Sequence, residues 1–116
     1  MDRTERRRSV RMRPLHELPA TAVLLLDGRP LAALRVVDVS VGGLAIAPHA
    51  AIASSVIGTR LGLRLSLSHY GEHDVTVVVR WAADALVGAQ YVDLTPAATT
   101  AVRRYVAELL ERGAPS

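Results

Sequence analysis

Two short stretches of the sequence combine residue types that can bind a phosphate or a guanine base. In the first, Arg7 and Arg11 form the pattern R-x-x-x-R, and Arg6 directly precedes it. A guanidinium is always charged, and its fork of N–H donors matches phosphate oxygens and the O6/N7 edge of guanine. The second stretch, from Asp38 to Gly43, has the pattern D-x-S-x-x-G. Ser40 has no recognisable base near it, so both patterns predict ligand binding and no catalytic residue.

The second stretch offers groups that complement the first. The carboxylate of Asp38 can accept hydrogen bonds from the N1–H and the exocyclic amine of guanine, a donor pair that adenine lacks. Ser40 lies two residues further along a predicted strand, so it is expected to share a face with Asp38 and to donate to a phosphate or base oxygen. Gly42 and Gly43 are expected to allow a turn with positive φ and a close approach of the ligand. Taken alone, the stretch also fits a simple capped turn.

Charge is concentrated at the N-terminus. All fourteen basic residues are arginine, and the formal net charge is +3. Residues 1–13 contain six arginines and two acidic residues, a balance of +4, which leaves −1 for the rest of the chain. A basic arm on a nearly neutral body predicts an anionic partner bound at the arm. A solvated tail that only aids solubility is the alternative.

The composition excludes several classes of site. The chain has no cysteine, which removes disulfides, thiolate zinc sites and cysteine nucleophiles. His69 and His73 lie in a predicted hairpin turn, where loop residues are more usual than metal ligands, and no glycine-rich phosphate loop is present. We therefore expect no metal, no cofactor and no enzymatic activity. The uncharged segment from Val39 to Thr59 contains Pro, His, Ser and Gly residues and is interpreted as strand, loop and strand, so no membrane span is expected.

Alternation of apolar and polar residues predicts a mainly β fold. Four leucines from Leu61 to Leu67 alternate with smaller or polar residues, and four apolar residues from Val75 to Trp81 do the same. Each set is expected to share one face of its strand. In an earlier strand, Leu34 and Val36 would share the face of Asp38 unless the strand bends near residue 37. Strands are predicted over residues 21–27, 31–41, 44–47, 61–67, 75–81 and 86–94.

A helix is predicted after the last strand. Thr95 and Pro96 suit the N-cap and the first helical position, and Gly113 suits the end. One apolar stripe is expected to pack on the body of the protein, formed by Val102, Tyr105, Val106, Leu109 and Leu110. These elements predict a small six-stranded antiparallel β-barrel with a C-terminal α-helix and an extended N-terminal arm. Within this one domain, residues 1–18 are expected to be a flexible arginine-rich ligand-binding arm without a place in the core, residues 19–94 the barrel, and residues 95–113 the helix packed on it.

The R-x-x-x-R and D-x-S-x-x-G patterns, in this order and at this separation, resemble the PilZ domain family. The resemblance implies a receptor that binds the bacterial second messenger cyclic di-GMP on the outer surface of the barrel, with the arm wrapping over the ligand. It assigns Arg7 and Arg11 to the first motif, and Asp38, Ser40 and Gly43 to the second. In this family, an arginine at the position of Arg6 resembles the pattern of domains that bind an intercalated pair of ligand molecules. Further similarities are Glu5-Arg6-Arg7, Leu44-Ala45-Ile46 and Gly88-Ala89-Gln90-Tyr91.

The expected function is that of a cytoplasmic receptor whose ligand switches its interaction with a partner protein. Partners in the family include flagellar, pilus and polysaccharide-export machinery, and the sequence does not select among them. One alternative is a nucleic-acid-binding module with a basic arm, which the low aromatic content, one Trp and three Tyr without Phe, disfavours. Another alternative is a PilZ-like protein-interaction adaptor that binds no nucleotide. The two intact motifs argue against this adaptor.

Overall fold

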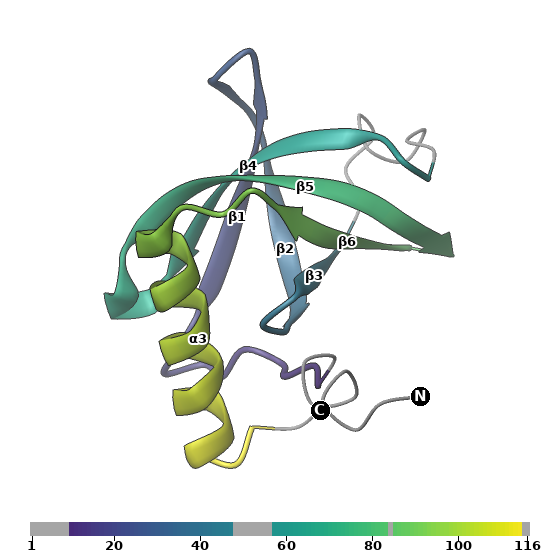
Figure 1. The fold of residues 1–116 in the computed structure, drawn as a ribbon. Coiled ribbons are helices and arrows are strands. Elements are labelled where there is room, and N and C mark those ends of the chain that lie inside the picture. The colour runs from purple at the N-terminus through teal and green to yellow at the C-terminus, as the bar shows by residue number, and fades with distance from the viewer. Residues whose placement is uncertain (1–9, 48–56, 84, 115–116) are drawn as a thin grey trace.

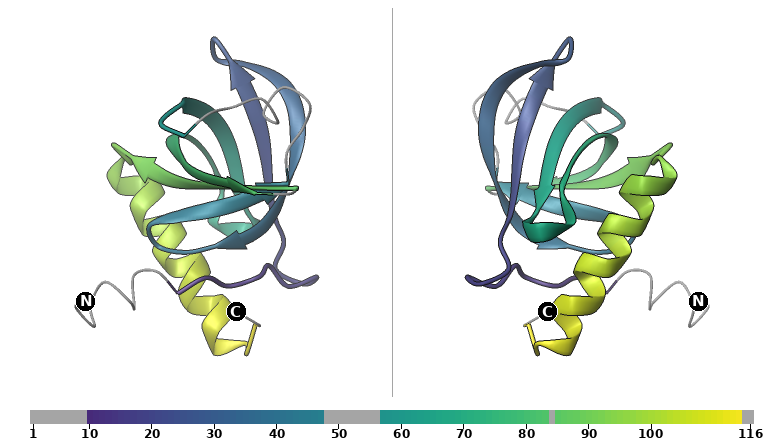
Figure 2. Two further views of the ribbon diagram at one scale, coloured as in Figure 1. Left: turned by 90° about the vertical axis from the view of Figure 1, so that its right-hand side faces the viewer. Right: turned by 90° about the vertical axis from the view of Figure 1, so that its left-hand side faces the viewer.

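The computed structural model describes residues 10–47, 57–83 and 85–114. These residues form six antiparallel strands that close into a barrel, with one helix beside it (Figures 1 and 2). The strands follow the order β1-β2-β3-β6-β5-β4 around the barrel. The predicted fold class is therefore confirmed. The elements are β1 (Ala20–Leu26), β2 (Arg29–Val39), β3 (Gly43–Ala47), β4 (Arg60–Leu67), the 3-10 turn η1 (Ser68–Tyr70), β5 (Glu72–Ala83), β6 (Leu86–Val92) and α3 (Pro96–Glu111).

The barrel interior is filled by the alternating residues of its strands. Leu63, Leu65 and Leu67 of β4 are fully buried, and so are Val77 and Val79 of β5. Burying one such side chain contributes about 1.5–3 kcal/mol relative to leaving it in water. The alternation read from the sequence thus identifies the inner wall of these two strands. The outer wall of β4 carries polar residues such as Arg64 and Ser66.

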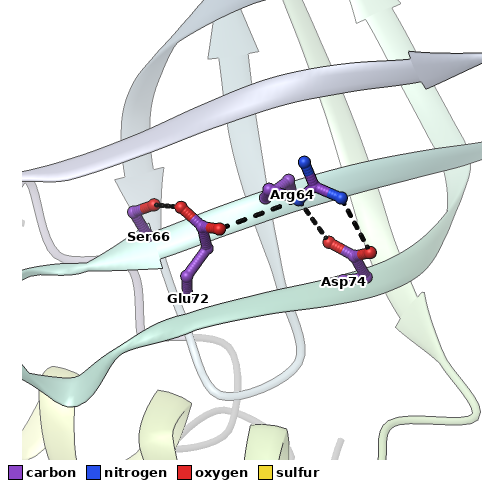
Figure 3. A network of polar contacts seen from close by, with 4 residues as sticks. All are labelled: Arg64, Ser66, Glu72 and Asp74. Atoms are coloured by element: carbon purple, nitrogen blue, oxygen red, sulfur yellow. Dashed lines mark hydrogen bonds and ion pairs between the residues drawn. The ribbon is translucent and has the colours of Figure 1, made fainter. Parts of the chain in front are cut away.

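Figure 3 shows a network of ion pairs and hydrogen bonds on the outer face of β4 and β5. Arg64 donates to both carboxylate oxygens of Asp74, at 2.8 and 3.2 Å, and its Nε lies 3.8 Å from Glu72. Ser66 donates to the other oxygen of Glu72 at 3.2 Å. Hydrogen bonding to Arg64 lowers the pKa of Asp74. The charge of Arg64 on this face is therefore neutralised by two neighbouring carboxylates.

Helix α3 begins where the sequence predicts. The amide of Ala98 donates to the Thr95 hydroxyl oxygen at 3.1 Å, so Thr95 is the N-cap. The hydroxyl of Tyr105 is buried and donates to the carbonyl of Leu18 at 2.8 Å, which ties the helix to the segment before β1. Leu110 is 64% exposed, so the predicted apolar stripe is wrong at this position. Its side chain lies on the outward side of the last turns, where no described element covers it. Within the described ranges, no helix has the length and apolar character needed to cross a membrane.

The described part of the arm contacts the core. Met12 and Leu18 are 2% and 1% exposed, so the expectation that this segment has no place in the core is wrong for these two residues. Met12 and Val39 exchange two backbone hydrogen bonds of 2.9 Å, which lays the arm antiparallel to the end of β2. A single bridged pair has no periodicity, so alternation could not reveal it. Residues 1–9, including Arg6 and Arg7, lie outside the described residues.

Candidate functional site

The bridge between Met12 and Val39 brings the two sequence patterns together. Because the pairing is antiparallel, Arg11 lies beside Ser40, the residue that follows β2. Both line an open cavity of about 660 Å³ on the outer surface of the barrel. Gly43 lines the same cavity, whereas Asp38 does not. Residues from β5, β6 and α3 complete it, and these include Arg80, Trp81, Gly88, Gln90 and Arg103.

Ser40 organises the turn between β2 and β3. Its hydroxyl oxygen accepts from the amides of Gly42 and Gly43 at 3.3 and 3.1 Å, and the hydroxyl donates to the Gly43 carbonyl at 3.2 Å. The Ser40 amide donates to the same carbonyl at 2.8 Å. Strand β2 ends at Val39, so the turn and not strand alternation sets the direction of Ser40. Its hydroxyl is already engaged in the turn, which differs from the predicted donation to a ligand.

Gly43 is needed for close strand packing. The prediction of positive φ is wrong at this turn, because the described glycines with positive φ are Gly28, Gly58, Gly71 and Gly113. A Cβ on Gly43 would lie 2.1 Å from the carbonyl oxygen of Ala89 in β6. Strand β3 can therefore approach β6 only with glycine at this position.

Asp38 lies just after an irregularity in β2. The register with β3 shifts between Val36 and Asp38, so the strand bends near residue 37, one of the two possibilities raised by the alternation. One carboxylate oxygen of Asp38, Oδ1, is buried and has no hydrogen-bond donor among the described residues, and the same holds for the hydroxyl of Tyr91. Burial, and secondarily the charge of Asp38, raise the pKa of Tyr91. A buried acceptor without a donor is costly, and this oxygen is closed off from the cavity that Ser40 and Gly43 line.

The alternation did not identify Trp81 as a site residue. It placed Trp81 on the face of Val79, which is buried in the core. The register between β5 and β6 shifts between Val79 and Trp81, and Trp81 consequently pairs with Gly88 on the outer face. A Cβ on Gly88 would lie 2.1 Å from the indole, so the ring covers this glycine. The guanidinium carbon of Arg11 lies 5.4 Å from the ring centre, a cation–π contact.

Three guanidiniums give the cavity a positive charge. Arg11, Arg80 and Arg103 line it, and none has a carboxylate partner within 4.0 Å in the described part of the chain. The Nε of Arg80 donates to the side-chain oxygen of Gln90 at 2.8 Å, which leaves its two terminal nitrogens for other acceptors. Arg80 and Arg103 carried no sequence signal, because they are separated along the chain from both motifs. No group of three or more His, Asp or Glu side chains suited to a metal occurs among the described residues.

Comparison with known proteins relates this geometry to a family. The model of the PilZ domain matches residues 5–108. The PilZ domain of YcgR from Escherichia coli, in a structure with cyclic di-GMP, superposes with a TM-score of 0.64 at 19% identity, covering 92% of this chain and 93% of that one. MrkH of K. pneumonia, also in a cyclic di-GMP complex, gives 0.71 at 19% identity over 91% of this chain, which spans 53% of MrkH. An uncharacterised Legionella protein gives 0.58 at 15% identity, covering 89% and 96% of the two chains.

No curated protein sequence matches the chain. The solved structures share its fold at low identity, and the family model covers both motifs and nearly the whole barrel and helix. Because the family model matches residues 5–108, the chain belongs to the PilZ domain family.

Proposed function

We propose that this domain is a receptor for cyclic di-GMP that binds the ligand on the outer face of β3, β5 and β6. The observation that carries the proposal is the convergence of Arg11, the turn at Ser40 and Trp81 on one positively charged cavity. The structures of the YcgR domain and of MrkH contain cyclic di-GMP, which supports the same ligand class here.

The chemistry of the cavity suits the parts of this ligand. Cyclic di-GMP carries two phosphates and two guanines, and the indole of Trp81 offers a flat face on which a base can stack. Arg11 lies over the same ring and can reach a guanine edge or a phosphate. Asp38 does not line the cavity, so its carboxylate would have to turn toward the ligand to accept from the Watson–Crick edge of guanine. Ser40 and Gly43 contribute by holding the turn and the close strand contact.

Arg6 and Arg7 of the arm would bind the ligand together with Arg11. Arg7 would supply the second guanidinium of R-x-x-x-R, and Arg6 a further one that offsets the charge repulsion between two stacked ligand molecules. The part of the arm before Val10 would pack over the ligand, at a cost of about 1–2 kcal/mol of backbone entropy for each residue fixed. The ordered arm and ligand then form a new surface for a partner protein. The domain acts in the cytoplasm by binding, without catalysing a reaction.

Calorimetric titration of cyclic di-GMP into the full chain tests the proposal. We expect a saturable heat and a parallel change in the fluorescence of Trp81, which is the one tryptophan of the chain and therefore reports on the site. Two ligands per chain are expected, and Arg6→Ala should reduce this ratio to one. Random oligonucleotides at two salt concentrations provide the control. Absence of heat at high micromolar cyclic di-GMP, or stronger binding of the oligonucleotides, would contradict the receptor function.

Asp38→Ala is expected to remove selectivity for guanine. The wild-type domain should bind cyclic di-GMP more tightly than cyclic di-AMP, because adenine cannot satisfy the carboxylate. Loss of a hydrogen bond to a charged group costs about 1.5–3 kcal/mol, so the affinity for cyclic di-GMP should fall by roughly one to two decades, with little change for cyclic di-AMP. Competition between the two nucleotides measures the difference. Equal affinities in the wild type would show that Asp38 does not read the base.

A further inference from the structure

Helix α3 contributes one side chain to the cavity, and this contact lies outside the two motifs. Arg103 lines the cavity together with the turn of residues 40–44 and Arg80. We propose that Arg103 binds a phosphate of the ligand, which makes helix α3 part of the ligand-binding surface. The proposal rests on the proposed function, since the phosphates belong to cyclic di-GMP.

The two neighbouring arginines of α3 point to different surroundings. Successive helical residues are about 100° apart around the helix axis, so the side chains of Arg103 and Arg104 point in different directions and line different cavities. Arg104 lines two separate depressions beside Tyr70, away from the cavity that contains Trp81. Both side chains are exposed and carry the same charge. The chain thus contains a matched pair in which one member faces the site.

Arg103 has a charge that the described protein does not neutralise. Glu108, one turn further along the same helix, accepts from Arg112 at 2.8 Å and from Tyr70, and lies 3.3 Å from His69. No carboxylate among the described residues lies within 4.0 Å of Arg103. Arg103 therefore retains its capacity to pair with an anion brought by a ligand.

The other cavity residues suggest which part of the ligand Arg103 meets. Trp81 and Arg11 lie together and provide the stacked surface for a base. Arg103 approaches from the helix, while the strands supply the rest of the cavity. The formal negative charges of cyclic di-GMP are on its phosphates, so a guanidinium at the cavity without a carboxylate partner is suited to a phosphate.

Binding of a phosphate by Arg103 would connect helix and barrel through the ligand. The helix is already attached to Leu18 by the 2.8 Å bond from Tyr105, and to η1 by the bond between Tyr70 and Glu108. Arg103 precedes both attachments along the helix. Ligand binding would therefore add a third attachment, from α3 to the turn between β2 and β3.

Affinity measurements on Arg103→Ala and Arg104→Ala, in the full chain, test the assignment. We expect Arg103→Ala to weaken cyclic di-GMP binding by about tenfold or more, and Arg104→Ala to leave it within about twofold. Arg103→Lys should retain more affinity than Arg103→Ala, because an ammonium still binds a phosphate as a point charge. The affinity of Arg103→Ala should also depend less on salt than that of the wild type, because one charge contact has been removed.

The outcomes separate the two proposals. If the wild type does not bind cyclic di-GMP, the receptor function and the role of Arg103 both fail. If the wild type binds and Arg103→Ala equals Arg104→Ala, only the role of Arg103 is overturned. If Arg103→Ala binds more weakly but with the same salt dependence as the wild type, Arg103 makes no charge contact with a phosphate and the assignment is overturned. Thermal unfolding of each variant checks the fold, and Arg103→Gln, which keeps the length of the side chain better, replaces the alanine variant if that variant is unstable.

Discussion

Replacement of Arg11 by alanine is expected to weaken cyclic di-GMP binding by roughly one to two decades, because it removes a charge-assisted hydrogen bond worth about 1.5–3 kcal/mol. The same change removes the cation–π contact with Trp81, so the tryptophan fluorescence of the free protein should change as well. Calorimetry measures the affinity, and emission spectra of the unliganded variant measure the contact. Thermal unfolding of the variant distinguishes loss of the ligand contact from loss of the fold.

Arg29→Ala is the matched control for this experiment. Arg29 is exposed at the hairpin between β1 and β2, where it lines a different depression with Pro30 and Leu31. The substitution removes the same charge from the protein, so any general electrostatic attraction of the anionic ligand is reduced equally. We expect an affinity within about twofold of the wild type. Equal losses in the two variants would mean that Arg11 acts only through net charge.

Gly43→Ala is expected to destabilise the whole barrel. The added Cβ would lie 2.1 Å from the carbonyl oxygen of Ala89, which is backbone and cannot rotate away. Strands β3 and β6 must separate, and overpacking of this kind costs about 1–3 kcal/mol and occasionally more. We place this variant at the upper end of that range, with the melting temperature lowered by roughly 10 °C. Ligand binding should weaken too, because the turn that Ser40 organises begins at the same contact.

Gly62→Ala serves as the control because it adds the same methyl group to a strand without a clash. The nearest atom to its Cβ would be the Cβ of Leu25, at 3.7 Å, which is ordinary van der Waals contact. Alanine is also less costly than glycine in a strand, by about 0.5–1 kcal/mol. The melting temperature should therefore stay the same or rise slightly. A Gly43→Ala variant that melts within about 2 °C of the wild type would show that β3 and β6 tolerate the separation.

The arginine arm is part of the barrel structure as well as of the proposed ligand site. The backbone bridge between Met12 and Val39 places Arg11 next to the turn, and burial of Met12 holds that bridge in place. Arg11 is therefore positioned over Trp81 without a ligand. The predictions for Arg6 and Arg7 concern the part of the arm before Val10. Because Arg11 is already in place, less entropy is lost in positioning it on binding.

Much of the architecture could be read from local patterns in the chain. Apolar residues at every second position mark each long strand wherever one face is buried. Thr95 and Pro96 mark the start of the helix, because capping involves only neighbouring residues. The R-x-x-x-R and D-x-S-x-x-G patterns are local too, and the structure brings Arg11 and the turn of the second pattern together at one cavity. Their roles in binding remain predictions that the experiments above address.

The rest of the site was decided by contacts between distant parts of the chain. Trp81 reaches the outer face because the pairing of β5 with β6 shifts at residue 80 and because Gly88 leaves room for its ring. Ser40 turns inward to its own loop because β2 ends one residue earlier, at Val39. Arg103 meets the cavity only because the helix packs beside the strands. A register shift or a helix position depends on which residue stands opposite in space, and the periodicity of a single segment contains no information about its partner.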